Sequence, residues 1–98
     1  MREMRFDVPC VRACLVRERQ VCTVRGYYLS EGEVMVKGVG VCLRKRLGEV
    51  VRRDDLFKYL PFSGFSTLDA WWLAIRGFVR DDRKLWLYVV RAPKRQSA

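Results

Sequence analysis

The sequence predicts a mainly β domain of the α+β class, folded as a small β-barrel with peripheral helices. Short runs rich in Val, Leu and aromatic residues alternate with glycines and polar turns, which is typical of β-strands. Two segments show helical spacing of apolar residues. The 98 residues fit a single domain over 1–98, with a polar tail expected to fray from about residue 92. A sheet this short hides its edges best by closing, which favours the barrel.

The first half of the chain predicts β, α, β, β, β in that order. We expect a short strand over 5–8, and a helix over 9–18 that begins at Pro9. Three β-rich stretches follow: one at 20–26, one at 34–37 after a turn at 30–32, and one or two strands within 38–53.

The second half predicts two helices and a final strand. A short helical segment begins at Asp54 and ends before Pro61. Ser66 is a good N-cap for the next helix, with Asp69 completing a capping box. Its buried face is predicted from the 3- and 4-residue spacing of Phe65, Leu68, Trp72, Ile75 and Val79. The last strand covers 84–92.

The charge favours a polyanionic partner. The chain carries 20 Lys and Arg against 11 Asp and Glu, for a formal charge of +9. Arginine dominates, and its fork suits phosphate. The absence of His and Asn also fits a thermophilic surface, although acidic residues would then be expected to increase too. We expect RNA as the partner, in a cytoplasmic protein without a signal peptide or membrane span.

The four cysteines predict buried free thiols and no metal site. Cys10, Cys14, Cys22 and Cys42 contain no Cys-x-x-Cys pair, and no His completes a mixed zinc site. We expect neither a metal nor a cofactor. If the source is a hyperthermophile, Cys10 and Cys14, one helical turn apart, are the candidates for a disulfide.

Two motifs resemble the ASCH superfamily, whose fold is PUA-like. "ERQVCTVRG" resembles the family's G-x-K-x-x-T-x-R signature, with Thr23 and Arg25 on the Thr and Arg positions. "SGFSTLDAWWLAI" places Gly64 and Phe65 on the Gly-Phe that opens a helix. "GYYLSEGEVMVKG" resembles the stretch between them, so the resemblance covers roughly residues 5–91. It implies a PUA-like barrel and RNA binding.

The departures from the family weigh against catalysis. One branch hydrolyses the acetyl amide of acetylcytidine and is thought to use a Lys, a Thr and a Glu. Gln20 stands at the Lys position and Ser63 just before the Gly-Phe, so only Thr23 is left of the three. A Thr hydroxyl is a poor nucleophile without a base, and a carboxylate from Glu49, Asp54 or Asp55 would have to supply one.

We therefore predict a non-catalytic RNA or nucleotide cleft between the Q-x-x-T-x-R strand and the S-G-F loop. The cleft residues are Gln20, Thr23, Arg25, Tyr27, Ser63 and Gly64, and the residues that hold the RNA backbone are Arg17, Arg19, Arg44, Lys45 and Arg46. One alternative is an amidohydrolase of acetylated cytidine with Thr23 as nucleophile. Another is a protein-interaction module that uses exposed Trp71 and Phe78. Thr23 and Arg25 also fit a purely structural role, in which they satisfy turn carbonyls near the Gly-Phe loop.

Overall fold

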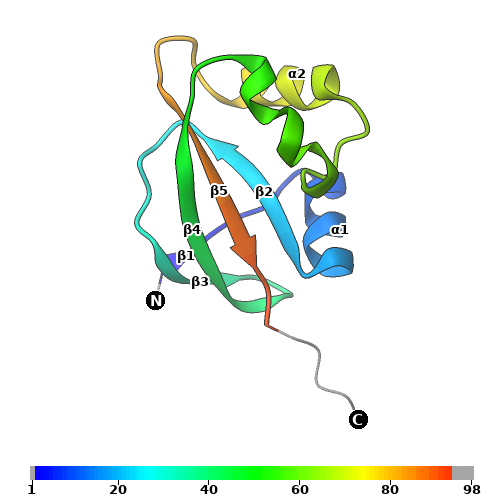
Figure 1. Cartoon of the computed structure of the whole chain (residues 1–98). Helices are drawn as coiled ribbons and strands as arrows, with labels where there is room; N and C mark the ends of the chain where they lie inside the picture. The colour runs from blue at the N-terminus through cyan, green and yellow to red at the C-terminus, as the bar shows by residue number, and fades with distance from the viewer. Residues whose placement is uncertain (1, 94–98) are drawn as a thin grey trace.

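The computed structural model describes residues 2–93 and shows an α+β fold built on one five-stranded sheet. The elements follow the predicted order: β1 (Arg2–Glu3), α1 (Pro9–Glu18), β2 (Gln20–Arg25), β3 (Gly32–Val36), β4 (Gly40–Val50), the 3-10 helix η1 (Arg53–Phe62), α2 (Leu68–Phe78) and β5 (Leu85–Arg91). Figure 1 shows the long strands β4 and β5 beside β2, with α1 and α2 at the margin of the sheet.

The sheet is open, so the described residues do not form the predicted closed barrel. Its strand order is β1-β3-β4-β5-β2, with β1 parallel to β3 and every other pair antiparallel. β1 and β2 lie at opposite edges and do not pair. At one edge of the sheet, β1 is only two residues long, and at the other edge α1 packs beside β2. Both features protect the exposed strand edges, which a closed barrel would not have.

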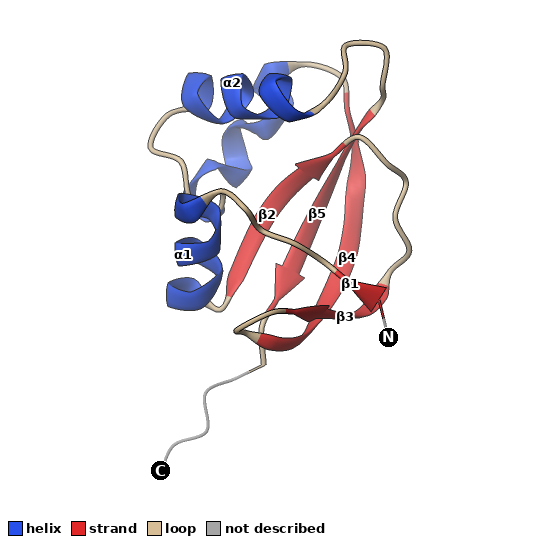
Figure 2. Cartoon of the chain, turned by 180° about the vertical axis from the view of Figure 1, so that it is seen from behind, coloured by secondary structure: helices blue, strands red, loops and turns tan. Residues whose placement is uncertain are grey.

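Each face of the sheet has its own hydrophobic core, because successive side chains of a strand point to opposite faces. We call the face that carries Val21, Val90 and Cys42 the inner face; α1 and the N-terminal segment cover it. We call the face that carries Cys22 and Val89 the outer face; η1 and α2 cover it. Figure 2 shows the N-terminal segment crossing the inner face between β1 and α1.

The N-terminal strand differs from its prediction. Residues 5–8 were expected to pair in a sheet, but β1 is Arg2–Glu3 and pairs with Val34 and Met35. The ladder continues only to Met4, whose N–H donates to the Met35 carbonyl at 2.9 Å. The rest of the segment leaves the sheet edge because Met4 and Phe6 are buried in the inner core.

Helix α1 spans its predicted residues, whereas α2 begins one residue later than predicted and η1 ends two residues later. Thr67, rather than Ser66, is the N-cap of α2, and its hydroxyl accepts from the Ala70 N–H at 3.1 Å. The buried tryptophan is therefore Trp71, at 3% exposure, and not Trp72, which is half-buried beside it. η1 continues through Pro61 to Phe62, since its end is closed by the Ser63 N–H donating to the Leu60 carbonyl.

The cysteines are free thiols, as the sequence predicts, and Cys14, Cys22 and Cys42 are buried. Burial, with a smaller contribution from the nearby Cys14, raises the pKa of the Cys22 thiol to about 11, while the charge of Arg91 opposes the shift. Such thiols are poor nucleophiles at neutral pH, so they act as small apolar core residues. The described residues contain no group of His, Cys, Asp and Glu side chains that could hold a metal ion. None of the helices in residues 2–93 has the length and apolar character of a bilayer span.

Candidate functional site

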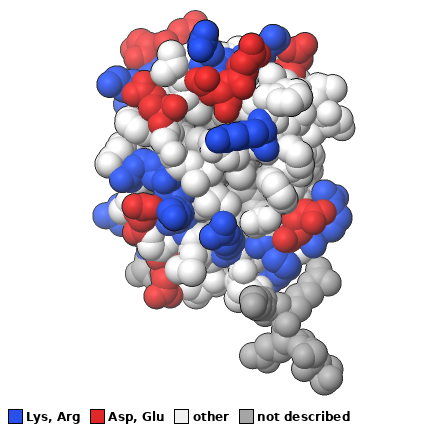
Figure 3. All heavy atoms as spheres, in the orientation of Figure 1, with Lys and Arg blue, Asp and Glu red and all other residues white. Residues whose placement is uncertain are grey.

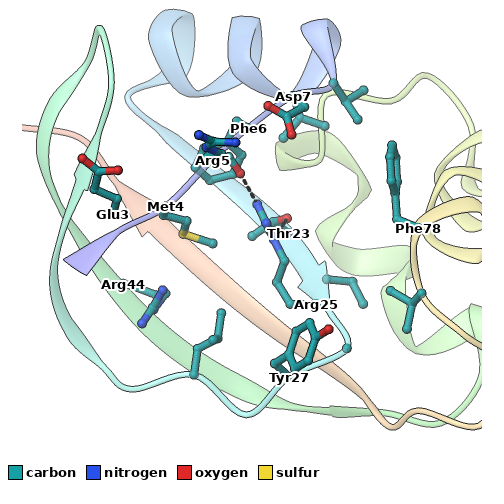
Figure 4. Close-up of a pocket in the computed structure, with 16 residues that line it drawn as sticks. Glu3, Met4, Arg5, Phe6, Asp7, Thr23, Arg25, Tyr27, Arg44 and Phe78 are labelled. Carbon is teal, nitrogen blue, oxygen red and sulfur yellow. Dashed lines mark hydrogen bonds between the residues drawn. The ribbon is translucent and has the colours of Figure 1, made fainter.

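A groove of about 410 Å³ lies on the inner face, between the N-terminal segment and strand β2. One wall consists of residues 3–8, and the other is formed by the end of β2 and the loop that follows it. Arg44 of β4 contributes to the groove from the far side of β5, and Phe78 and Val79 contribute from the end of α2. Figure 4 shows Thr23, Arg25, Tyr27 and Arg44 around this space.

Strand register explains why polar side chains from three strands share this face. Thr23 pairs with Tyr88, and Tyr88 pairs in turn with Arg46 across β5. Arg25 lies two residues beyond Thr23, and Arg44 two residues before Arg46, so alternation directs all of them to the inner face. β2 and β4 flank β5, which separates their backbones by roughly 10 Å, at about 4.8 Å per strand. Long arginine side chains can span that distance.

Arg25 is held in place by contacts to the N-terminal segment. Its Nη2 donates to the Arg5 carbonyl at 2.8 Å, and its Nε donates to Thr23 Oγ1 at 3.4 Å. The guanidinium carbon lies 5.1 Å from the centre of the Phe6 ring, in cation–π geometry. These contacts give Arg25 the structural role considered above, but the carbonyl that it satisfies belongs to the N-terminal segment.

Arg44 lies at the base of the groove and is only 4% exposed. Its Nε donates to the Ser30 carbonyl at 2.8 Å and its Nη2 to the Ser30 hydroxyl at 3.3 Å. For both Arg25 and Arg44 the hydrogen bonds found among residues 2–93 use Nε and Nη2 and leave Nη1 unused. Each guanidinium therefore keeps donors for a ligand.

The two arginines form an electropositive site. No Asp or Glu forms an ion pair with either one in the part of the chain that the structure describes. Burial lowers the pKa of the Arg25 guanidinium and the charge of Arg44 lowers it further, while Asp7 opposes the shift. Burial also lowers the pKa of Arg44. Both groups stay cationic at neutral pH, so an anion in the groove would relieve their desolvation and repulsion.

Four of the predicted site residues line this groove: Thr23, Arg25, Tyr27 and Arg44. Arg46 lies on the same sheet face beside the groove, where its Nη1 donates to the Leu29 carbonyl at 3.0 Å. The other predicted residues lie elsewhere, and each has a local reason.

Strand alternation places Gln20 and Lys45 on the outer face. Gln20 is three residues before Thr23 and so points to the opposite face, and Lys45 lies between the inward-facing Arg44 and Arg46. Arg17 is exposed near the end of α1 and pairs with Glu18 at 3.0 Å. Arg19 ends α1 in the left-handed region, with φ 59°, and donates to the Pro93 carbonyl at 2.7 Å. These four residues do not line the groove.

Ser63 and Gly64 lie in a structural loop that does not reach the groove. Ser63 is fully buried; its hydroxyl donates to the Leu60 carbonyl at 2.8 Å and accepts from the Phe65 N–H at 3.0 Å. Gly64 has φ 87°, and a Cβ there would collide with the backbone of Cys10. The Gly-Phe motif therefore packs the connection between η1 and α2 against α1 and does not line the groove.

The N-terminal segment is the part of the site that sequence reasoning missed. Glu3, Arg5, Phe6 and Asp7 line the groove although no periodic pattern marks them. The available signal was the charged and apolar mixture of "MREMRFD", which is unusual for a strand buried on both faces.

Among the described residues, the hydrogen bond at the Thr23 hydroxyl comes from Arg25, and none to a carboxylate is found. Glu49, Asp54 and Asp55, the carboxylates considered from the sequence, do not line the groove. The carboxylates that do line it are Glu3 and Asp7. Of the two residues named for an interaction module, Trp71 is buried in the outer core, whereas Phe78 is 72% exposed.

Comparisons of this chain with protein-family models, with curated proteins and with solved structures find no match. The resemblance to the ASCH superfamily therefore stays a prediction, carried by the two motifs and their spacing.

Proposed function

We propose that this protein binds RNA without catalysis, and that the groove between the N-terminal segment and β2 receives a nucleotide of the RNA chain. The observation that carries the proposal is the presence of Arg25 and Arg44 in one groove, neither of them in an ion pair with a carboxylate among the described residues. Two cations held close to each other favour an anionic ligand, and a guanidinium fork matches phosphate.

The size and lining of the groove support a nucleotide-sized ligand. About 410 Å³ lies within the usual range for small-ligand sites. The lining combines three guanidinium groups and two carboxylates with a hydroxyl and three aromatic rings, from Arg5, Arg25, Arg44, Glu3, Asp7, Thr23, Phe6, Tyr27 and Phe78. Phosphate contacts, a base-edge contact and a stacking surface are the three interactions that single nucleotides use.

The wider surface supports the same proposal. The formal charge of +9 favours association with a polyanion at low salt. Figure 3 shows the outer face, where Lys and Arg are scattered among uncharged and acidic residues and do not form one continuous basic patch. The proposal therefore assigns specific binding to the groove and leaves the outer face to non-specific attraction.

Fluorescence anisotropy with labelled RNA over a salt series tests the proposal. We expect Arg25→Ala to weaken binding about 10-fold or more, the loss typical of one charge-assisted hydrogen-bonding group. The slope of log affinity against log salt should fall by about 0.7 for a single-stranded ligand, because one phosphate contact is lost.

Arg17→Ala is the matched control, because it removes the same charge from an exposed position outside the groove. If Arg17→Ala and Arg25→Ala weaken binding equally, only net charge is acting and the groove is not the site. A parallel titration with DNA of the same sequence separates RNA recognition from general polyanion binding. Incubation with acetylcytidine, with Thr23→Ala as control, tests the hydrolase alternative.

A further inference from the structure

Two consecutive exposed tyrosines mark the loop between β2 and β3. Tyr27 is 61% exposed and Tyr28 is 62% exposed, although both follow directly from a strand whose central residues are buried. Exposed aromatic rings that are adjacent in sequence and placed at the rim of a cationic groove are typical of binding surfaces rather than of cores.

The backbone of this loop is fixed by the side chain of Tyr88 beneath it. The Tyr88 hydroxyl donates to the Tyr27 carbonyl at 2.8 Å and accepts from the Leu29 N–H at 2.6 Å. Arg46 adds a third anchor by donating to the Leu29 carbonyl at 3.0 Å. The rings are thus exposed on a backbone that is already ordered, which lowers the entropy lost when a ligand binds.

Each tyrosine ring is also positioned by a cation. The Arg83 guanidinium lies 5.0 Å from the centre of the Tyr27 ring, and the Arg46 guanidinium lies 3.9 Å from the centre of the Tyr28 ring. Trp86 meets Tyr28 edge-on, with ring centres 4.8 Å apart and an interplanar angle of 82°. Cation–π and edge contacts of this kind restrict ring rotation while leaving most of each ring exposed.

Tyr27 connects this aromatic rim to the groove. Tyr27 lines the groove, whereas Arg83 does not. Figure 4 shows the Tyr27 ring at the groove's edge beside Arg25. A nucleotide with its phosphate at Arg25 and Arg44 would therefore meet Tyr27, and Tyr28 is the next residue of the loop.

We infer that Tyr27 and Tyr28 form a stacking platform for two neighbouring unpaired bases, so that the ligand is a single-stranded segment. This inference rests on the proposed function, because the phosphate contacts at Arg25 and Arg44 bring the strand to the platform. Bases in a duplex already stack on each other and cannot present their faces to a protein ring, whereas bases of a single strand can. Stacking on tyrosine tolerates any base, so the platform selects strandedness rather than sequence.

Binding of single-stranded and hairpin RNA of equal length tests the inference. We expect tighter binding of the single strand, and a loss of about 5- to 150-fold with Tyr27→Leu or Tyr28→Leu, the range measured when one stacked base loses its aromatic partner. Tyr27→Phe and Tyr28→Phe keep the ring and should keep the affinity. Phe57→Leu is the matched control, since Phe57 is 69% exposed on η1 and lines no part of the groove.

Stacking has a readout of its own. An oligonucleotide carrying 2-aminopurine should lose fluorescence on binding to the wild type and to the Phe variants, but not on binding to the Leu variants. If both Leu variants bind and quench like the wild type while Arg25→Ala weakens binding, the inferred stacking platform is wrong, but the proposed phosphate contacts at Arg25 and Arg44 are supported. If the wild type binds no RNA at low salt, the proposed function itself is wrong.

Discussion

Removal of the Tyr88 hydroxyl tests how the sheet supports the tyrosine loop. Tyr88 is fully buried, and its hydroxyl makes two hydrogen bonds to the loop backbone, to the Tyr27 carbonyl and from the Leu29 N–H. Tyr88→Phe keeps the ring, so it opens no large cavity in the core. At about 1 kcal/mol for each bond, the free energy of unfolding should fall by about 2 kcal/mol. For a domain of this size that corresponds to a loss of roughly 8–16 °C in Tm.

Urea denaturation of the Tyr88→Phe variant measures this change, with Tyr59→Phe as the matched control. Tyr59 is half-buried, and its hydroxyl makes no hydrogen bond among the described residues. We expect a lower midpoint at an unchanged m value. A loss below about 0.5 kcal/mol, no larger than that of Tyr59→Phe, would show that the loop is not anchored through Tyr88. The reasoning about a preordered platform would then be refuted as well.

Four further substitutions test the fold. Trp71→Ala should lower the free energy of unfolding by about 3–5 kcal/mol, because that ring is buried. Trp72→Ala should lower it clearly less, because that ring is half-buried. Chemical denaturation of both variants measures the difference. Gly64→Ala should lower Tm, because a side chain at φ 87° is strained and meets the Cys10 backbone. Asp55 accepts from two backbone N–H groups, and these bonds hold its pKa below 3.8. A depressed pKa adds stability above about pH 3.8 that is lost as pH falls through the folded value. Asp55→Asn should therefore be less stable at pH 7, and the gap should close in acid; a gap that persists at pH 2 would contradict the assignment.

The candidate site could be predicted from the sequence only in part. The alternation of side chains along a strand can be read from the sequence, but the positions of distant segments relative to each other cannot. Thr23 and Arg25 were predicted to share a face, and they do. The same alternation places Gln20 on the opposite face. For this residue, the two-residue alternation of a strand was a better guide than its position in the motif that resembles the ASCH family. Arg44 enters the groove across β5, and only the strand order brings it there.

The buried tryptophan shows the limit of helical periodicity. Adjacent residues on a helix are about 100° apart, so a shift of one residue in the N-cap decides which ring faces the core. Ser66 and Thr67 are both good N-caps by residue type. Thr67 becomes the cap because α2 must turn Trp71 and Ile75 toward the outer core formed with η1.

The α+β class, the order of the elements, the limits of α1 and the strand that carries Thr23 and Arg25 could all be predicted from the sequence. These follow from local patterns: a proline at a helix start, apolar periods of two or three to four, and glycines between strands. The open sheet and the path of residues 3–8 across its inner face appear only in the folded structure. The same holds for the shared groove of Arg25 and Arg44, whose strands flank β5. Those outcomes depend on contacts between residues far apart in the chain, which no local pattern encodes.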